Sequence, residues 1–343
     1  MKIVFTGGGT AGHVTPNLAL IDKLSNEQIY YVGTDGMEKA LTAPYVENGK
    51  IKEYREITAR KFQRKLTLQN LALPFRLIKS VNEAKKQLKD IRPDVIFSKG
   101  GYVGLPVIIA GKLLKIPTAI HESDMSLGLA NKISARFADV MLSAFPCDRR
   151  AEVVGLIIRE EILHGDRQKG LETMGFDGAN PILLVTGGSL GAKALNDAVA
   201  GCPKLSERFD VFVITGKNKH IDCDFVRQAE FVTNINDVFA ASSVCLTRGG
   251  ANTLAELALS QVPFVTVPLT KQSRGEQVKN AEWFVDRGCG LMLSEENLPD
   301  KLLNAVNTAY DNRSAIQAKQ KAHRIIYGTD KVVEAIRLLT LRD

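Results

Sequence analysis

Short apolar runs alternate with longer amphipathic stretches along most of the chain. In the first half the apolar runs lie at residues 2–6, 29–33, 94–98, 117–122 and 139–143. Strands of a parallel sheet have this nearly continuous apolar character, because helices cover both faces of the sheet. The alternation therefore predicts an α/β fold with a doubly wound parallel sheet.

The same pattern starts again at "PILLVTGGSLGAKALNDAV" (181–199). Further apolar runs at 210–216, 229–233, 243–247 and 263–268 predict the strands of a second sheet. Residues 297–343 have mostly helical spacing. A chain of 343 residues is long for one core, so two domains are expected.

We expect the two domains to be two Rossmann-like halves. The first would cover residues 1–155 and would be completed by a C-terminal helix within 325–343. The second would cover residues 156–324. Ligands bind at the carboxyl ends of the strands in such folds.

Each half has a glycine-rich turn between a strand and a helix, "GGTAG" at 8–12 and "GGSLG" at 187–191. Glycine lets a ligand approach the backbone, and a helix N-terminus offers free N–H groups and a positive dipole end. The turns therefore favour an anion cradle, although a turn needed only for packing is the alternative. Residues 7–12 ("GGGTAG") have the spacing G-x-G-x-x-G, but no acidic residue ends the second predicted strand as a ribose anchor would. Neither turn matches G-x-x-x-x-G-K-[ST]. These features argue against a dinucleotide or a P-loop nucleotide.

Composition narrows the class of protein. The residues are 45% hydrophobic and 24% charged, as in ordinary globular domains, and no long apolar segment is present. Because the first residues have the apolar pattern of a strand, we expect no secretory leader. The five cysteines are scattered without a C-x-x-C spacing, so we expect reduced thiols in the cytoplasm and no metal site. Asp222-Cys223-Asp224 resembles an Asp-x-Asp metal motif, but we interpret it as a surface turn because it lies outside the predicted ligand loops.

The net charge of +7 is concentrated in one segment. Residues 60–92 contain ten Lys or Arg and two acidic residues, so this segment carries +8 and the rest of the chain −1. Apolar residues are interleaved with the cations over residues 59–80. This mixture favours contact with an anionic membrane surface, at about 1 kcal/mol for each basic residue near the surface. The predicted contact residues are Arg60, Lys61, Arg64, Lys65, Phe75, Arg76 and Lys79.

The basic segment has two other interpretations. An ordinary solvated helix face, kinked at Pro74, would need no partner. Nucleic acid is disfavoured, because the segment lacks Tyr and Trp for base stacking and contains no nucleic-acid motif.

Several motifs together identify a family. They are "GGGTAGH" (7–13), "KGGYVGLP" (99–106), "HESDMSLGLANK" (121–132), "GGSLGAKALN" (187–196), "RGGANTLAE" (248–256) and "GEQVKNA" (275–281). With these motifs in order over its whole length, the chain resembles the MurG-type N-acetylglucosaminyltransferases of bacterial peptidoglycan synthesis. The resemblance implies a GT-B fold, in which two Rossmann-like domains face a central cleft.

The resemblance also implies an activity. Family members move N-acetylglucosamine from UDP-N-acetylglucosamine (UDP-GlcNAc) to the C4 hydroxyl of N-acetylmuramic acid on lipid I, with inversion, which gives lipid II. UDP-GlcNAc is then a substrate and no cofactor is expected. The implied location is the cytoplasmic face of the bacterial cell membrane, as a peripheral protein, with other cell-wall synthesis proteins as candidate partners.

His13 is the leading candidate for the catalytic base, because an imidazole titrates near neutral pH. The alternative is a histidine that only orients the glycine turn. By resemblance, His121, Glu122 and Asp124 position the acceptor or a loop, and Tyr102 faces the acceptor.

The resemblance places the donor site mainly in the second half. Glu256 would bind the ribose hydroxyls, Ile235 would lie beside uracil, and Gln277 would read the sugar, with Glu276 as its competitor. The other donor-binding residues implied are Thr10, Ala11, Gly12, Arg159, Ser189, Ala251, Asn252, Thr253 and Leu254. "GLIIR" (155–159), "HESD" (121–124) and "SRGEQ" (273–277) depart from the usual family pattern around Arg159, Asp124 and Gln277.

Three other functions were weighed: another GT-B transferase acting on diacylglycerol, a UDP-sugar epimerase, and a regulator that binds a UDP-sugar without turnover. The "HESD…GLANK" block argues against the first two. Retention of His13, Glu256 and Gln277 favours an enzyme over the regulator.

Overall fold

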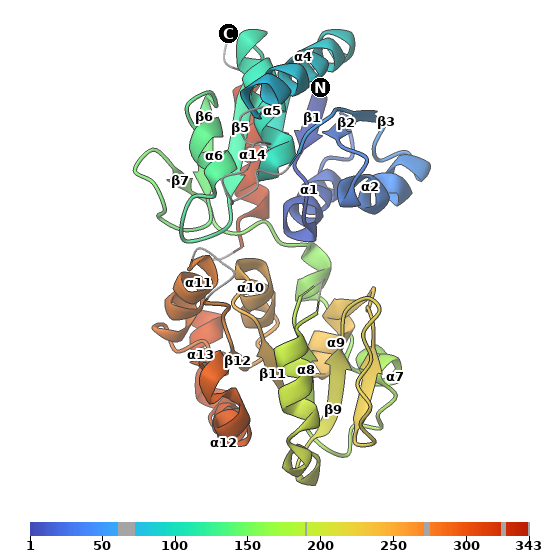
Figure 1. Cartoon of the computed structure of the whole chain (residues 1–343), viewed down its shortest axis with the longest axis vertical. Coiled ribbons are helices and arrows are strands. Elements are labelled where there is room, and N and C mark those ends of the chain that lie inside the picture. The colour runs from blue at the N-terminus through green and yellow to red at the C-terminus, as the bar shows by residue number, and fades with distance from the viewer. Residues whose placement is uncertain (61–72, 189–190, 271–274, 324–326, 342–343) are drawn as a thin grey trace. The chain divides into compact units, whose positions relative to one another are not determined.

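The computed structural model describes residues 1–60, 73–188, 191–270, 275–323 and 327–341 (Figure 1). The chain divides into two compact units. The first unit comprises Met1–Arg159 and Tyr327–Asp343, and the second unit comprises Glu160–Ile326. Each unit is built on its own parallel sheet with helices against it, which confirms the predicted fold class.

The sheet of the first unit has seven strands in the order β3-β2-β1-β4-β5-β6-β7. The strands are β1 (Lys2–Thr6), β2 (Gln28–Gly33), β3 (Glu53–Glu56), β4 (Val95–Ser98), β5 (Thr118–Glu122), β6 (Val140–Ser143) and β7 (Glu152–Val153). The helices described are α1 (Ala11–Lys23), α2 (Met37–Glu47), α4 (Leu73–Ile91), α5 (Gly101–Leu113), α6 (Leu129–Ser134) and α14 (Thr329–Leu339).

The order of this sheet reverses at β1. Ile3 pairs with Ile29 of β2 on one side and with Val95 of β4 on the other, both in parallel. Successive connections therefore leave β1 and β4 in opposite directions, and a crevice opens at the carboxyl ends of these two strands. The first glycine turn follows β1 at this crevice.

The C-terminal helix α14 belongs to the core of the first unit, although it is far from the other helices in sequence (Figure 1). Its buried face includes Val332 and Ile336, both 0% exposed. Its first residue, Thr329, is tied to the chain entering the second unit: the Thr329 hydroxyl donates to Ile158 O at 2.7 Å and accepts from Ile158 N at 2.9 Å. The two chain crossings between the units are therefore fixed to each other.

The sheet of the second unit has six strands in the order β10-β9-β8-β11-β12-β13. The strands are β8 (Ile182–Thr186), β9 (Asp210–Ile214), β10 (Val226–Ala229), β11 (Val244–Thr247), β12 (Phe264–Thr266) and β13 (Leu291–Met292). The helices are η1 (Glu160–Leu163), α7 (Arg167–Met174), α8 (Lys193–Ala200), η2 (Pro203–Glu207), α9 (Ile235–Ala241), α10 (Ala251–Leu259), α11 (Glu276–Val285), η3 (Glu295–Asn297), α12 (Leu298–Asp311) and α13 (Arg313–Ala322). Here β8 takes the central place, paired with β9 and β11.

The strand predicted at 229–233 is wrong in position. The observed strand β10 is Val226–Ala229, and Phe231 is 68% exposed in the segment after it. Because β10 lies at the edge of the sheet, it accommodates polar residues such as Arg227 and Gln228, which the apolar pattern does not detect. The edge strand β3 ("EYRE") was not predicted for the same reason, and β7 and β13, with two residues each, are too short to give a pattern.

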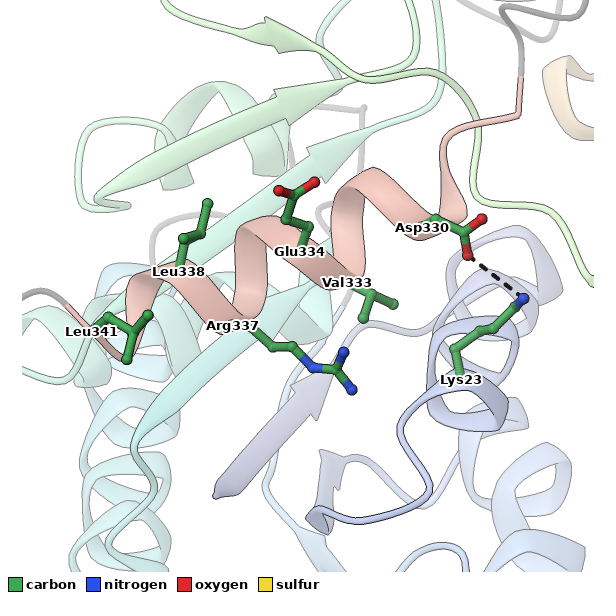
Figure 2. A pocket seen from close by; sticks show the side chains of 7 residues that line it. All are labelled: Lys23, Asp330, Val333, Glu334, Arg337, Leu338 and Leu341. Atoms are coloured by element: carbon green, nitrogen blue, oxygen red, sulfur yellow. Dashed lines mark ion pairs between the residues drawn. The ribbon is translucent and has the colours of Figure 1, made fainter.

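A pocket of about 340 Å³ lies along α14 and the end of α1, where Lys23 pairs with Asp330 at 3.5 Å (Figure 2). It is lined by Lys23, Asp330, Val333, Glu334, Arg337, Leu338 and Leu341. None of the site residues predicted from the sequence lines it.

Replacing Ile336 by alanine should destabilise the first unit by about 2–5 kcal/mol, because it removes a fully buried side chain and leaves a cavity. Leu338→Ala on the same helix is the matched control. Leu338 is 52% exposed, so that change should stay within about 0.5 kcal/mol. Urea unfolding of both variants measures the difference, and equal losses would show that α14 does not contribute to this core.

Candidate active site

Two turns of the first unit meet at the carboxyl ends of β1 and β4. A Cβ on Gly9 would lie 2.4 Å from Cε1 of Tyr102, and a Cβ on Gly101 would lie 2.4 Å from Gly8 O and 3.4 Å from Nδ1 of His13. Both glycines also have positive φ, +83° and +78°. The turn after β1 and the turn after β4 therefore need glycine to approach each other, and His13 lies at their contact.

His13 is the third residue of α1, and its Nδ1 lies 2.8 Å from Oγ1 of Thr10. When Nδ1 carries the proton and donates to Thr10, Nε2 is the unprotonated nitrogen of the ring and can act as a base. Thr10 is the residue before the helix, so the glycine turn itself orients the ring. This arrangement suits a general base.

A buried carboxylate that no sequence motif indicates supports the same turn. Glu38 of α2 is 0% exposed, and its Oε2 accepts a hydrogen bond from Gly9 N at 3.1 Å. Its Oε1 accepts from the amide of Thr34 at 3.0 Å and from the Thr34 hydroxyl. The Gly9 amide is thus already occupied, so an anion at this turn would use the first amides of α1, those of Ala11 and Gly12, which have no intrahelical acceptor.

Tyr102 is the second residue of α5, and its ring packs against Gly9. Burial and the Glu38 carboxylate raise the pKa of Tyr102, and a hydrogen bond with Thr34 opposes them. The phenol therefore stays protonated at neutral pH and can donate a hydrogen bond. This is consistent with a residue that binds the acceptor and does not take its proton.

His121 is the penultimate residue of β5 and is 0% exposed. Its Nε2 lies 2.9 Å from the carbonyl oxygen of Gly155, which can only accept, so Nε2 donates. Burial lowers the pKa of His121 well below its usual range. A neutral buried imidazole in this state fixes the chain around Gly155 and does not exchange protons with a substrate.

Glu122 shapes the loop that contains Asp124. Its carboxylate is 6% exposed and accepts hydrogen bonds from the amides of Ser123, Asp124 and Gly128 and from Nδ2 of Asn131, at 2.9–3.1 Å. All of these hydrogen bonds are made with other groups of the protein, so the role of Glu122 is to stabilise the loop. Asn131 was not predicted; its side chain also fills the space where Gly100 would carry a Cβ, at 2.6 Å.

In the second unit, the start of α11 packs against the turn after β11. A Cβ on Gly249 would lie 2.4 Å from Gln277 O, and Nδ2 of Asn280 donates to Gly249 O at 3.3 Å. Oε1 of Gln277 accepts from Leu269 N at 3.0 Å, which leaves its Nε2 as the free donor group. Glu276 is the first residue of the same helix.

At the same edge of the sheet, the start of α10 combines buried and half-buried side chains. Ala251 and Leu254 are buried, so only their backbone groups can meet a ligand, whereas Asn252, Thr253 and Glu256 are half-buried. The first amides of this helix have no intrahelical acceptor and lie at the positive end of its dipole. An anion is therefore favoured there.

Ile235 is the first residue of α9 and is half-buried. The buried carboxylate of Asp237 fixes this helix start, because it accepts from Asp166 N at 2.8 Å and from Nδ2 of Asn234 at 3.2 Å. Asp237 was not predicted, since one acidic residue inside a short helix carries no pattern.

Two predicted donor residues remain, Arg159 and Ser189. Arg159 ends the segment Met1–Arg159 of the first unit. Its buried Nε has no hydrogen-bond partner among the described residues. Ser189 lies outside the described residues. The glycines around it, Gly188 and Gly191, have φ values of +77° and +63°. Asp222 and Asp224 are exposed in the segment before β10.

The basic segment is only partly described, since Lys61, Arg64 and Lys65 lie outside the described residues. In the first turns of α4, Phe75 is 76% exposed and Ile78 is 58% exposed. The flanking cations Arg76 and Lys79 are exposed as well, as is Arg60. Large apolar side chains surrounded by cations form a surface suited to an anionic lipid headgroup layer. No helix in the described ranges has both the length and the apolar character needed to cross a bilayer.

Comparison with known proteins agrees with this architecture. The model of the glycosyltransferase family 28 N-terminal domain matches residues 3–143, and that of the family 28 C-terminal domain matches residues 182–336. Among solved structures, MurG of Acinetobacter baumannii is 26% identical with a TM-score of 0.75, over 98% of this chain and 99% of that one. A UDP-GlcNAc 2-epimerase from Neisseria meningitidis is 14% identical with a TM-score of 0.61, over all of both chains, which shows a shared fold alone.

Two curated relatives are named UDP-N-acetylglucosamine–N-acetylmuramyl-(pentapeptide) pyrophosphoryl-undecaprenol N-acetylglucosamine transferase. The protein from Lachnoclostridium phytofermentans is 39% identical over 99% of each chain. The protein from Legionella pneumophila strain Paris is 39% identical over 98% of this chain and 96% of its own. The chain therefore belongs to glycosyltransferase family 28, in the family of these N-acetylglucosamine transferases, as its sequence motifs predict.

Proposed function

We propose that the chain transfers N-acetylglucosamine from UDP-GlcNAc to the C4 hydroxyl of N-acetylmuramic acid on lipid I, with inversion, to give lipid II and UDP. Full-length relatives that bear the transferase name support the activity. The observation that carries the mechanism is the hydrogen bond between His13 Nδ1 and Thr10 at the mouth of the first glycine turn.

In this mechanism Nε2 of His13 takes the proton of the acceptor hydroxyl while the oxygen attacks the anomeric carbon. The attack comes from the face opposite the diphosphate, so the configuration inverts. The bond between the anomeric carbon and the phosphate oxygen breaks, and its electron pair leaves with UDP. A base of this kind contributes about 10²–10⁴-fold to the rate.

The leaving UDP carries the charge that develops in this step. We assign its diphosphate to the amides that open α10, at Ala251–Thr253, because these amides and the helix dipole stabilise negative charge without rearranging. The amide of Leu254 already donates to Gly250 O at 3.0 Å, so Leu254 supports the helix start. Ser189 and Arg159, with Thr10, Ala11 and Gly12 of the first unit, are assigned further contacts with the diphosphate and the donor sugar.

The rest of the donor is read by side chains at the same edge of the second unit. Glu256 has two acceptor oxygens for the two ribose hydroxyls, and Ile235 provides an apolar surface for uracil. Gln277 reads the sugar through its Nε2, because Leu269 N occupies its oxygen.

The acceptor is assigned to the first unit. Tyr102 and Asp124 contact its sugar. The buried side chain of Glu122 holds the loop that presents Asp124, and His121 fixes the neighbouring chain at Gly155. The acceptor is tethered to a lipid, which fits the exposed apolar and basic start of α4. We assign that surface to the anionic cytoplasmic leaflet of the cell membrane.

The direct test is incubation of the purified chain with UDP-GlcNAc and a lipid I analogue. Formation of the lipid II analogue and UDP is the expected result. Binding of UDP-GlcNAc without product would support a regulator and contradict the proposal, and release of UDP-N-acetylmannosamine would indicate an epimerase.

His13→Ala should lower kcat about 10²–10⁴-fold, because no other group replaces the base, while the affinity for UDP stays unchanged. The control is His164→Ala, since His164 is exposed in the second unit and plays no part in the mechanism. Initial rates and calorimetric titration with UDP measure the two effects. Turnover of His13→Ala within about threefold of the parent would exclude His13 as the base.

Gln277→Ala should raise KM for UDP-GlcNAc about threefold to tenfold through loss of one hydrogen bond to the sugar, whereas the inhibition constant of UDP stays the same. Glu276→Ala is the matched control and should leave KM within twofold. The reverse pattern would assign the sugar contact to Glu276.

Combining Phe75→Ser, Arg76→Glu and Lys79→Glu should weaken binding to vesicles that contain anionic lipid at least tenfold, because apolar burial and electrostatic attraction are both lost. Turnover of a water-soluble acceptor should not change. The control carries the same change of charge at two exposed sites of the second unit, Lys301→Glu and Lys321→Glu. Equal losses of turnover on soluble and vesicle-bound acceptors would contradict a membrane role.

A further inference from the structure

A buried glutamate of the first unit has no role in the mechanism above. Glu38 is the second residue of α2 and is 0% exposed. Its Oε2 accepts a hydrogen bond from Gly9 N at 3.1 Å, and its Oε1 accepts from Thr34 N at 3.0 Å and from the Thr34 hydroxyl. A carboxylate is costly to bury unless it is hydrogen-bonded in this way. The side chain therefore joins the turn after β1 to the turn after β2.

The first glycine turn is shaped around this carboxylate. A Cβ on Gly8 would lie 2.5 Å from Cδ of Glu38 and 2.6 Å from its Oε2, and a Cβ on Gly36 would lie 3.2 Å from the same oxygen. Neither glycine has a positive φ, so the backbone conformation alone does not require glycine at these positions. A side chain at Gly8 would instead displace the carboxylate from its hydrogen bonds.

The hydrogen bond to Gly9 acts one residue before the group that orients the base. Thr10 follows Gly9, and its Oγ1 lies 2.8 Å from Nδ1 of His13. The peptide unit between Gly9 and Thr10 is planar, so a shift of Gly9 is passed on to Thr10. On its other side Gly9 packs against Tyr102, since a Cβ there would lie 2.4 Å from Cε1 of the ring. The position of the turn is thus set between Tyr102 and Glu38.

A glutamine at position 38 could not make the same contacts. It has nearly the volume of glutamate but only one acceptor atom in its side chain. The amides of Gly9 and Thr34 both need an acceptor, so one of them would face the NH₂ group of the glutamine. A buried N–H that loses its acceptor is left with its full desolvation penalty. The geometry therefore requires a carboxylate at this position, and a side chain of the same size is not sufficient.

We propose that Glu38 is a positioning residue for the transfer reaction, which holds Gly9 and thereby sets where Thr10 places the ring of His13. This inference rests on the proposed function, in which His13 is the base. Because Glu38 acts through the turn, its loss should slow the chemical step. Binding of UDP-GlcNAc, which is assigned mainly to the second unit, should hardly change.

The test is Glu38→Gln, with Glu47→Gln at the exposed end of the same helix as the matched control. Glu38→Gln should lower kcat about 10- to 100-fold, because a displacement of about 1 Å at a reacting group can have an effect of this size. KM for UDP-GlcNAc should stay within threefold. Glu47→Gln should change neither constant by more than twofold.

A second control separates positioning from stability. Ile336→Ala removes a buried side chain of the same unit, at a residue to which the mechanism gives no role. It should lower the melting temperature without lowering kcat more than twofold, when rates are measured well below the melting temperature of every variant.

A double-mutant cycle with His13→Ala tests the route of the effect. If Glu38 acts through the base, Glu38→Gln should change the residual kcat of His13→Ala by less than twofold. Should Glu38→Gln fail to fold, Glu38→Asp takes its place in the cycle. Its carboxylate is shorter by one CH₂ and cannot reach Gly9 and Thr34 together, so kcat should fall about threefold to tenfold. This loss should also disappear in the His13→Ala background.

A kcat of Glu38→Gln within twofold of the parent would overturn the proposal. So would the loss of an equal factor with and without His13, since Glu38 would then act independently of the base. Equal losses of kcat in Glu38→Gln and Ile336→Ala would assign both effects to stability and overturn it as well. Formation of the lipid II analogue by the unmodified chain in the same assay tests the proposed function separately, so the two failures are distinguishable.

Discussion

The reversal of strand order at the centre of each sheet is the constraint on which the candidate site depends. In the first unit β1 is flanked by β2 and β4, and in the second unit β8 is flanked by β9 and β11, all in parallel. Parallel strands end at one edge, and connections that leave in opposite directions open a crevice there. Every residue to which we assign chemistry follows the end of a strand or lies in the helix after it.

The carboxyl edges of the two sheets carry different kinds of polar group. In the first unit, buried carboxylates at this edge support the loops: Glu38 accepts hydrogen bonds from Gly9 and Thr34, and Glu122 accepts them from the loop after β5. In the second unit, the amides that open α10 and the oriented amide of Gln277 supply neutral donors. A site of the first kind can orient a base, while one of the second kind can accept the charge of a leaving diphosphate.

The sequence predicts the central strands well, because their residues are apolar on both faces and stand out as short runs. Edge strands are harder: "EYRE" of β3 is half-buried and polar, and β10 shifts by three residues from its predicted start because only Val226 in it is buried. The glycine turns, His13 and the start of α10 could be found from motifs. These residues sit at turns where sequence and local geometry are directly linked.

The supporting residues could not be found in this way. In the sequence, nothing distinguishes Glu38 from other helical glutamates. Its burial follows only from the packing of α2 against the glycine turn. Asn131 and Asp237 likewise act through contacts with residues distant in the chain, and no local pattern encodes such contacts.

The most direct measurement is a crystal structure of the chain with UDP-GlcNAc. Our account predicts the nucleotide at the carboxyl edge of the second sheet, with uracil beside Ile235, ribose on Glu256 and the diphosphate at the amides of Ala251–Thr253. Density for the nucleotide in the pocket along α14, or anywhere away from the ends of β8 and β11, would contradict it (Figure 2).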